Sequence, residues 1–141
     1  MQTQILAPAA VLVAWSLIML LWMAATRMPA LKKYGVDTGN NRGGRGVDLD
    51  GVLPDEIQWK AHNYNHLMEQ PTIFYALAAI LAITGSATQL DIWLAWAYVA
   101  LRVIHSLWQA LINSIPVRIT IFTISSLVLM VLAVRAVMET V

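Results

Sequence analysis

"KAHNYNHLMEQPTIFYALAAI", residues 60–80, begins with polar side chains and ends in an unbroken apolar run. A glutamate, Glu69, and a proline, Pro71, stand where the character of the sequence changes. An apolar run of about 20 residues crosses a bilayer as a helix, so the second half of this stretch predicts a membrane span. The first half then places polar side chains at the lipid boundary.

The composition of the whole chain is that of a membrane protein. Of its 141 residues, 59% are hydrophobic and 12% are charged, which is too apolar for a soluble domain of this size. Acidic and basic residues are absent from 4–26, 70–90, 92–101, 103–117 and 119–134. We therefore expect an all-α integral membrane protein: one four-transmembrane-helix bundle over residues 1–141, with helices at about 4–26, 55–85, 91–113 and 117–138.

Prolines and glycines set the expected helix boundaries. Pro29 predicts the end of the first helix, and Pro54 begins the second, which Pro71 bends. Between them lies a loop at 27–54, whose centre "GNNRGGRG" (39–46) has the composition of a mobile segment. The alternative interpretation, a phosphate-cradling loop, lacks the strand and the Lys-Ser/Thr pair of a P-loop.

The distribution of charge predicts the topology and excludes some functions. Six of the nine basic residues lie between the end of the first helix and the first turns of the second, which predicts a cytoplasmic loop and both termini outside. These six are Arg27, Lys32, Lys33, Arg42, Arg45 and Lys60. A net charge of +1 argues against nucleic acid as a partner. Since the chain has no cysteine, any thiol chemistry must come with a ligand.

The second helix carries a polar stripe. His62, His66 and Glu69 follow one another by four and three positions, which places them on one face, and Asn63 flanks them. Counted back from Gly85, the lipid boundary lies near residue 65, so Glu69 is about one turn inside the hydrocarbon. A carboxylate at that depth needs a partner.

The third and fourth helices bring further polar groups to the same depth. Arg102 stands near the middle of the third helix, where an unpaired guanidinium costs roughly 2.5–3.5 kcal/mol, so we expect it to face the bundle interior. His105 and Gln109 follow on its face, and Arg118 begins the fourth helix. The predicted layer therefore joins Glu69, His105, Gln109 and Arg118.

Two functional interpretations of this layer stand beside purely structural ones. In the structural interpretation Glu69 pairs with Arg102, Arg118 snorkels to the interface, and the histidines only pack. In the first functional one, the layer is an anion site in which Arg118 favours the thiolate form of a bound thiol, while apolar electrophiles arrive through the bilayer. We expect no metal, although His62, His66 and Glu69, with His105, form a competing ligand set.

The chain resembles the MAPEG family, the membrane-associated proteins of eicosanoid and glutathione metabolism. "NYNHLMEQPTIFYAL" (63–77) is similar to the bacterial form of the motif on the family's second helix, and "RVIHS" (102–106) and "PVR" (116–118) match the third and fourth helices. The resemblance covers nearly the whole chain. It implies a left-handed four-helix bundle assembled as a homotrimer, with glutathione bound between subunits near the cytoplasmic side.

The resemblance also assigns roles to individual residues. Arg118 corresponds to the arginine that stabilises the thiolate, Glu69 to the glutamate that contacts glutathione, and His105 to the histidine of the third helix. The chain departs from the glutathione-using members at His62, His66, Gln109 and Phe122, where they have arginine, asparagine and two tyrosines.

The resulting hypothesis is an inner-membrane, bacterial-type transferase or peroxidase that uses glutathione or another thiol against lipophilic electrophiles. Arg118 would activate the thiol, and a set of polar side chains would hold it: His62, Asn63, His66, Glu69, Arg102, His105 and Gln109. The alternative is a non-enzymatic relative that binds membrane lipid and assists another enzyme.

Overall fold

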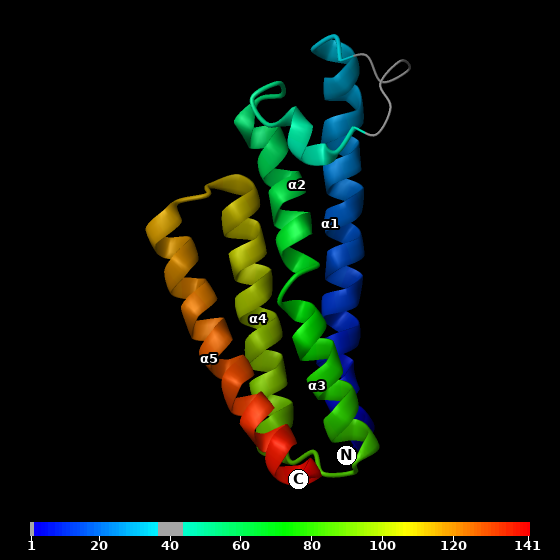
Figure 1. Cartoon of the computed structure of the whole chain (residues 1–141), viewed down its shortest axis with the longest axis vertical. Coiled ribbons are helices and arrows are strands. Elements are labelled where there is room, and N and C mark those ends of the chain that lie inside the picture. The colour runs from blue at the N-terminus through cyan, green and yellow to red at the C-terminus, as the bar shows by residue number, and fades with distance from the viewer. Residues whose placement is uncertain (1, 37–43) are drawn as a thin grey trace.

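The computed structural model describes residues 2–36 and 44–141 and builds them from helices (Figure 1). The elements are η1 Gln2–Ile5, α1 Leu6–Lys33, η2 Gly46–Leu49, α2 Asp55–Leu67, α3 Pro71–Ile83, α4 Gln89–Leu111 and α5 Ile115–Thr140. Within the described residues, four helical stretches are long and apolar enough to cross a membrane: Thr3–Lys33, Asp55–Ile83, Gln89–Leu111 and Ile115–Thr140. The prediction of an all-α, four-span membrane protein is confirmed.

Helix α4 lies at the centre of the bundle and packs against α1, α2 and α5. Its inner face holds Ala95, Tyr98 and Arg102, none of which is exposed to solvent. Phe74 of α3 stacks on Tyr98 with ring centroids 4.7 Å apart. Both termini lie at one end of the bundle, and the connection between α1 and α2 lies at the other (Figure 1).

The first helix does not end at Pro29, so that prediction is wrong. Pro29 lies inside α1, which continues to Lys33. A proline removes one backbone hydrogen bond, but helices in membranes tolerate it because neighbouring groups satisfy the freed carbonyl. The end is set instead by Gly35, whose φ of +68° is the left-handed conformation of a helix C-cap. Most of the predicted mobile segment, residues 39–43, lies outside the described residues.

The second span is two helices rather than one bent helix. Helix α2 ends at Leu67, a turn follows, and α3 begins at Pro71. Pro71 has no N–H to donate to the carbonyl of Leu67, and its ring crowds that carbonyl, so the helix stops. Thr72 instead donates its hydroxyl to the Glu69 carbonyl at 2.7 Å. The predicted position of the irregularity is right, and its extent is larger than a bend.

A glutamine side chain ties this break to two other helices. Gln70 donates to the Ser126 hydroxyl of α5 at 2.8 Å and accepts from the Tyr98 hydroxyl of α4 at 3.0 Å. Ser126 in turn donates to the Phe122 carbonyl at 2.8 Å. Hydrogen bonds between membrane helices each contribute about 0.6–2 kcal/mol. The bridge therefore fixes the broken span against α4 and α5.

An ion pair between a half-buried arginine and a buried aspartate closes the end of the bundle that holds the termini. Arg135, near the end of α5, bonds both carboxylate oxygens of Asp91 in the first turn of α4. The Asp91 carboxylate also accepts from the Thr88 backbone at 2.8 Å and the Thr88 hydroxyl at 2.9 Å. Asp91 thus caps α4 and anchors α5 with a single side chain, which compensates for its complete burial.

Removing the Gln70 bridge tests its contribution to stability. Gln70→Leu leaves the hydroxyls of Tyr98 and Ser126 without this partner, so we expect the free energy of unfolding in detergent to fall by about 1–2 kcal/mol. Tyr98→Phe in the Gln70→Leu background is expected to cost less than Tyr98→Phe alone. Gln89→Leu, at an exposed position of α4, serves as the control. If the losses of unfolding free energy in Gln70→Leu and Tyr98→Phe simply added in the double variant, the two side chains would not be coupled and the bridge would be contradicted.

Candidate functional site

A cluster of two histidines, an arginine and a phenylalanine joins α2, α4 and α5. The His66 and His105 rings stack with centroids 4.7 Å apart and an interplanar angle of 18°. Arg102 Nη2 lies 2.7 Å from His66 Nδ1 and donates to the His66 carbonyl at 3.3 Å. The Phe122 ring meets His66 edge-on at 5.3 Å and lies 5.9 Å from the Arg102 guanidinium carbon. The sequence prediction that Arg102 faces the bundle interior is confirmed.

The arginine also fixes the tautomer of His66. A guanidinium nitrogen can only donate, so His66 Nδ1 must accept, and the ring proton of neutral His66 resides on Nε2. Arg102 and His105 reach the cluster together because positions three apart share one helix face. The cluster thus presents a defined donor, His66 Nε2–H, beside a stacked ring and a cation.

Several buried polar atoms around the cluster have no partner among the described residues. These are both side-chain polar atoms of Asn63, Nε and Nη1 of Arg102, and Oε1 of Gln109. Asn63 precedes His66 by one turn and Gln109 follows His105 by one turn, so both lie on the side of the cluster nearer the α1–α2 connection. Each unpaired group costs about 1–3 kcal/mol. The layer is therefore incomplete within one chain.

Glu69 does not join this layer as expected. It is exposed, it lies in the turn between α2 and α3, and within residues 2–36 and 44–141 it forms no ion pair. The predicted Glu69–Arg102 pair is thus absent from the described chain, since the guanidinium bonds His66 instead. Because α2 ends at Leu67, Glu69 does not continue the helical stripe of His62 and His66.

A hydrogen bond to the connection between α4 and α5 holds the Arg118 side chain at the first turn of α5. Its Nη1 donates to Asn113 Oδ1 at 2.5 Å. Asn113 adopts a left-handed conformation, with φ of +57°, between the end of α4 and the start of α5. The other guanidinium nitrogens of the half-buried Arg118 make no hydrogen bond to the described residues. They are free to bind an anion.

His62 faces the loop rather than the cluster. Its Nε2 lies 2.9 Å from Asp50 Oδ1, which also accepts from Gln58 Nε2 at 2.7 Å. Gln58 in addition donates to the Gly46 carbonyl at 3.3 Å and accepts from Arg27 Nη2 at 3.2 Å. In the described part of the chain, no three His, Asp or Glu side chains form a group able to hold a metal ion. The competing ligand set is therefore not assembled.

Two glutamines that organise the site were not predicted from the sequence. Gln70 bridges three helices, and Gln58 joins α1, α2 and η2. Both are uncharged residues among many other polar groups, so charge and spacing alone do not distinguish them. The available signal for Gln70 was its position directly before a proline, at the start of the apolar run.

The Asp50 contacts generate a prediction about pH. Hydrogen bonds from Gln58 and then His62 lower the pKa of the Asp50 carboxyl. A carboxyl whose pKa is lower in the folded than in the unfolded state stabilises the folded loop at pH values above the unfolded pKa of about 3.9. This contribution is lost as the pH falls through the native pKa. We expect amide protection of residues 46–53, measured by hydrogen exchange and corrected for intrinsic rates, to hold down to about pH 4 and then fall.

Asp50→Asn is the matched variant for this measurement. It keeps an oxygen acceptor at the same position and removes the titrating group, so its protection is expected to be weaker near neutral pH and flat across the same range. An unchanged pH profile in Asp50→Asn would show that Asp50 does not anchor the loop.

Comparison with known proteins assigns the chain to a family. Residues 5–138 match the family described as MAPEG. Neither a curated protein nor a solved structure matches the chain. The match covers nearly the whole length and every described helix that could span a membrane. The chain therefore belongs to the MAPEG family.

Proposed function

We propose that this protein is a membrane-bound transferase or peroxidase that uses glutathione or another thiol against lipophilic electrophiles, with Arg118 stabilising the thiolate. We further propose a bacterial-type member that works as a homotrimer in the inner (cytoplasmic) membrane, with its termini outside. Family membership supports glutathione-related chemistry. The basic residues at the end of α1, in the α1–α2 connection and at the start of α2 support the orientation.

The main support for the proposal is that two opposite charges lie beside an incomplete polar layer and form no ion pair within the described residues. Glu69 is exposed and Arg118 is half-buried, and in the described residues neither forms an ion pair. The atoms of Asn63, Arg102 and Gln109 that lack partners are buried. A peptide thiol with an amine and carboxylates offers groups of both signs, together with amide donors and acceptors.

The same observation favours a site shared between copies of the chain. Buried polar atoms rarely remain unpaired, so the missing partners come from a ligand, from water or from a second protomer. The outward side of α5 is apolar, with exposed Ile119, Ile124 and Leu127, and suits either lipid or a neighbouring copy.

The chemistry follows from the charge of Arg118. The guanidinium lowers the free energy of the anionic sulfur relative to the thiol, so the proton leaves to water on the cytoplasmic side. The sulfur electron pair attacks an electron-poor carbon, a C–S bond forms, and the leaving group departs with its bonding electrons, as a halide from a chloroarene. His66 Nε2–H and Asn63 would orient the ligand.

Arg118→Ala tests the central residue of this proposal. We expect the rate of conjugation of glutathione to a chloronitroarene by the purified protein to fall by about 10²-fold or more, since removal of a single stabilising donor has that effect in other enzymes. Arg118→Lys is expected to retain part of the activity because it keeps the charge. Lys32→Ala, an exposed cation on α1, is the control, and equal rates for Arg118→Ala and wild type would exclude the proposal.

A second candidate, a non-enzymatic lipid-binding relative, is favoured by Phe122. Its ring occupies the position beside His66 and His105 where a phenol would supply a donor. In that case native mass spectrometry would retain a lipid on wild-type protein, and no conjugation or hydroperoxide reduction would be measurable. Phe122→Tyr distinguishes the two candidates. In an enzyme, the hydroxyl of the new tyrosine would raise the thiol-dependent rate, whereas in a lipid-binding protein no such rate would appear and lipid retention would be unchanged.

A further inference from the structure

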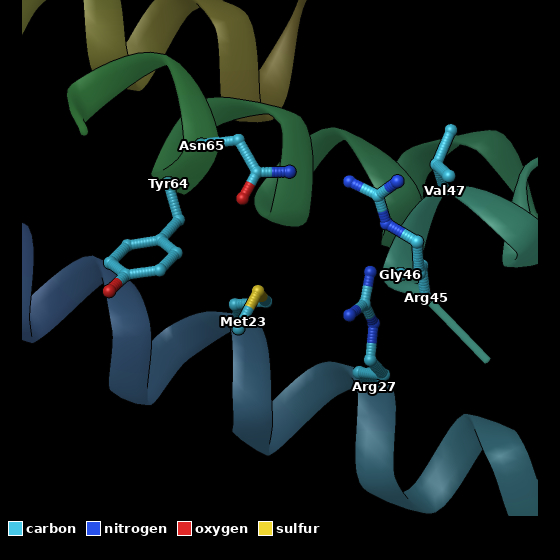
Figure 2. Close-up of a pocket in the computed structure, with 7 residues that line it drawn as sticks. All are labelled: Met23, Arg27, Arg45, Gly46, Val47, Tyr64 and Asn65. Atoms are coloured by element: carbon cyan, nitrogen blue, oxygen red, sulfur yellow. The ribbon is translucent and has the colours of Figure 1, made fainter. Parts of the chain in front are cut away.

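A pocket of about 300 Å³ lies between α1, α2 and the η2 turn, and Figure 2 shows the residues that line it. These three elements meet at the end of the bundle away from the termini (Figure 1). Its volume is at the lower limit of known small-molecule sites. It is lined from α1 by Met23 and Arg27, from α2 by Tyr64 and Asn65, and from the loop by Arg45 and Val47. It contains none of the residues assigned above to the thiol site, so the inference below does not rest on the proposed function.

Two cations face this pocket without an anion between them. Figure 2 shows the guanidinium groups of Arg27 and Arg45 directed into the space that the pocket encloses. The lining contains no carboxylate, and neither arginine forms an ion pair with the described residues. Arg27 Nε is buried and has no partner in that part of the chain. An anion bound by both guanidinium groups would join α1 to the loop and so stabilise the folded loop.

The loop is held in a position that allows this approach. Gln58 joins α2 to the Gly46 carbonyl at 3.3 Å and to Asp50 at 2.7 Å, and the Arg45 backbone N–H donates to Asp48 at 2.8 Å. A Cβ at Gly46 would lie 3.0 Å from Arg27 Nη1. Glycine at this position therefore leaves room for the Arg27 guanidinium beside the loop backbone.

The depth and the mixed lining indicate the class of ligand. Trp22 packs under the Lys60 ammonium, 5.4 Å from the ring centroid, in the arrangement expected at the membrane interface. Arg27 is five residues further along α1, or about 7.5 Å, which corresponds to the head-group region. Apolar Met23 and Val47 lie beside the two cations. This combination suits an anionic head group whose apolar remainder contacts the protein.

We propose that this pocket binds a phosphate group through Arg27 and Arg45, either as the head group of an anionic phospholipid or as a soluble phosphate ester. Arginine pairs recognise phosphate through parallel hydrogen bonds that a single lysine cannot supply. Asn65 and Tyr64 supply neutral polar groups at the same rim.

The test measures the retention of lipid by the full chain in nanodiscs and detergent. Native mass spectrometry compares phosphatidylglycerol with phosphatidylcholine, and soluble sn-glycerol 3-phosphate is added as a competitor. We expect phosphatidylglycerol to be preferred, and Arg45→Gln to weaken its binding about tenfold through loss of one charged contact. Gly46→Val is expected to do the same with no change of charge, because its side chain displaces the Arg27 guanidinium.

Lys32→Gln is the matched control, since Lys32 is an exposed cation near the same end of α1 that does not line the pocket. Displacement of lipid by glycerol 3-phosphate would support the site and show that the phosphate alone is recognised. Retention of phosphatidylglycerol against that competitor would support it with a membrane lipid as the ligand. Equal retention of the two lipids with no binding of glycerol 3-phosphate, or equal weakening in Lys32→Gln and Arg45→Gln, would overturn the proposal.

Discussion

The fold depends on one buried cation, Arg102, at the centre of α4. No part of this side chain is exposed to solvent, and in a membrane span an unsatisfied guanidinium would be costly. His66 supplies its ring nitrogen at 2.7 Å and its carbonyl at 3.3 Å. That carbonyl belongs to the last turn of α2, where the ladder of helical hydrogen bonds runs out. It also accepts from the Glu69 backbone N–H at 3.2 Å in the turn before Pro71, so Arg102 binds the second lone pair of this carbonyl.

The two ends of the bundle differ in how completely their polar groups are satisfied. At the end that holds the termini, Asp91 and Arg135 neutralise each other, and the loop there is short. In the half nearer the α1–α2 connection, Asn63, Arg102 and Gln109 keep buried atoms without partners in the described residues. A protein that needed only stability would replace such groups with apolar ones, often at a gain of stability. Their concentration in one half favours a binding role over a packing role.

The sequence predicted the number and type of the spans because apolar length and charge placement are strong signals in a membrane. It also predicted the inward face of Arg102, since the cost of exposing a guanidinium to lipid leaves few alternatives. It did not predict that α1 continues past Pro29, because a membrane helix tolerates the loss of one backbone hydrogen bond. Glu69 was misplaced because the helix break takes it out of the helical stripe, and His62 was misplaced because it contacts Asp50 in the loop. The Gln70 bridge was missed because it joins residues 28 and 56 positions apart in the sequence.

We propose that the incomplete polar layer is a site for a thiol ligand held by Arg118. The most direct test is the melting temperature of the purified protein with and without glutathione, for wild type and Arg118→Ala. A ligand that binds the folded state raises stability in proportion to the logarithm of its concentration once the site is saturated. We expect such a rise for wild type and a much smaller one for Arg118→Ala. Equal rises in both proteins, or no rise in wild type, would contradict it.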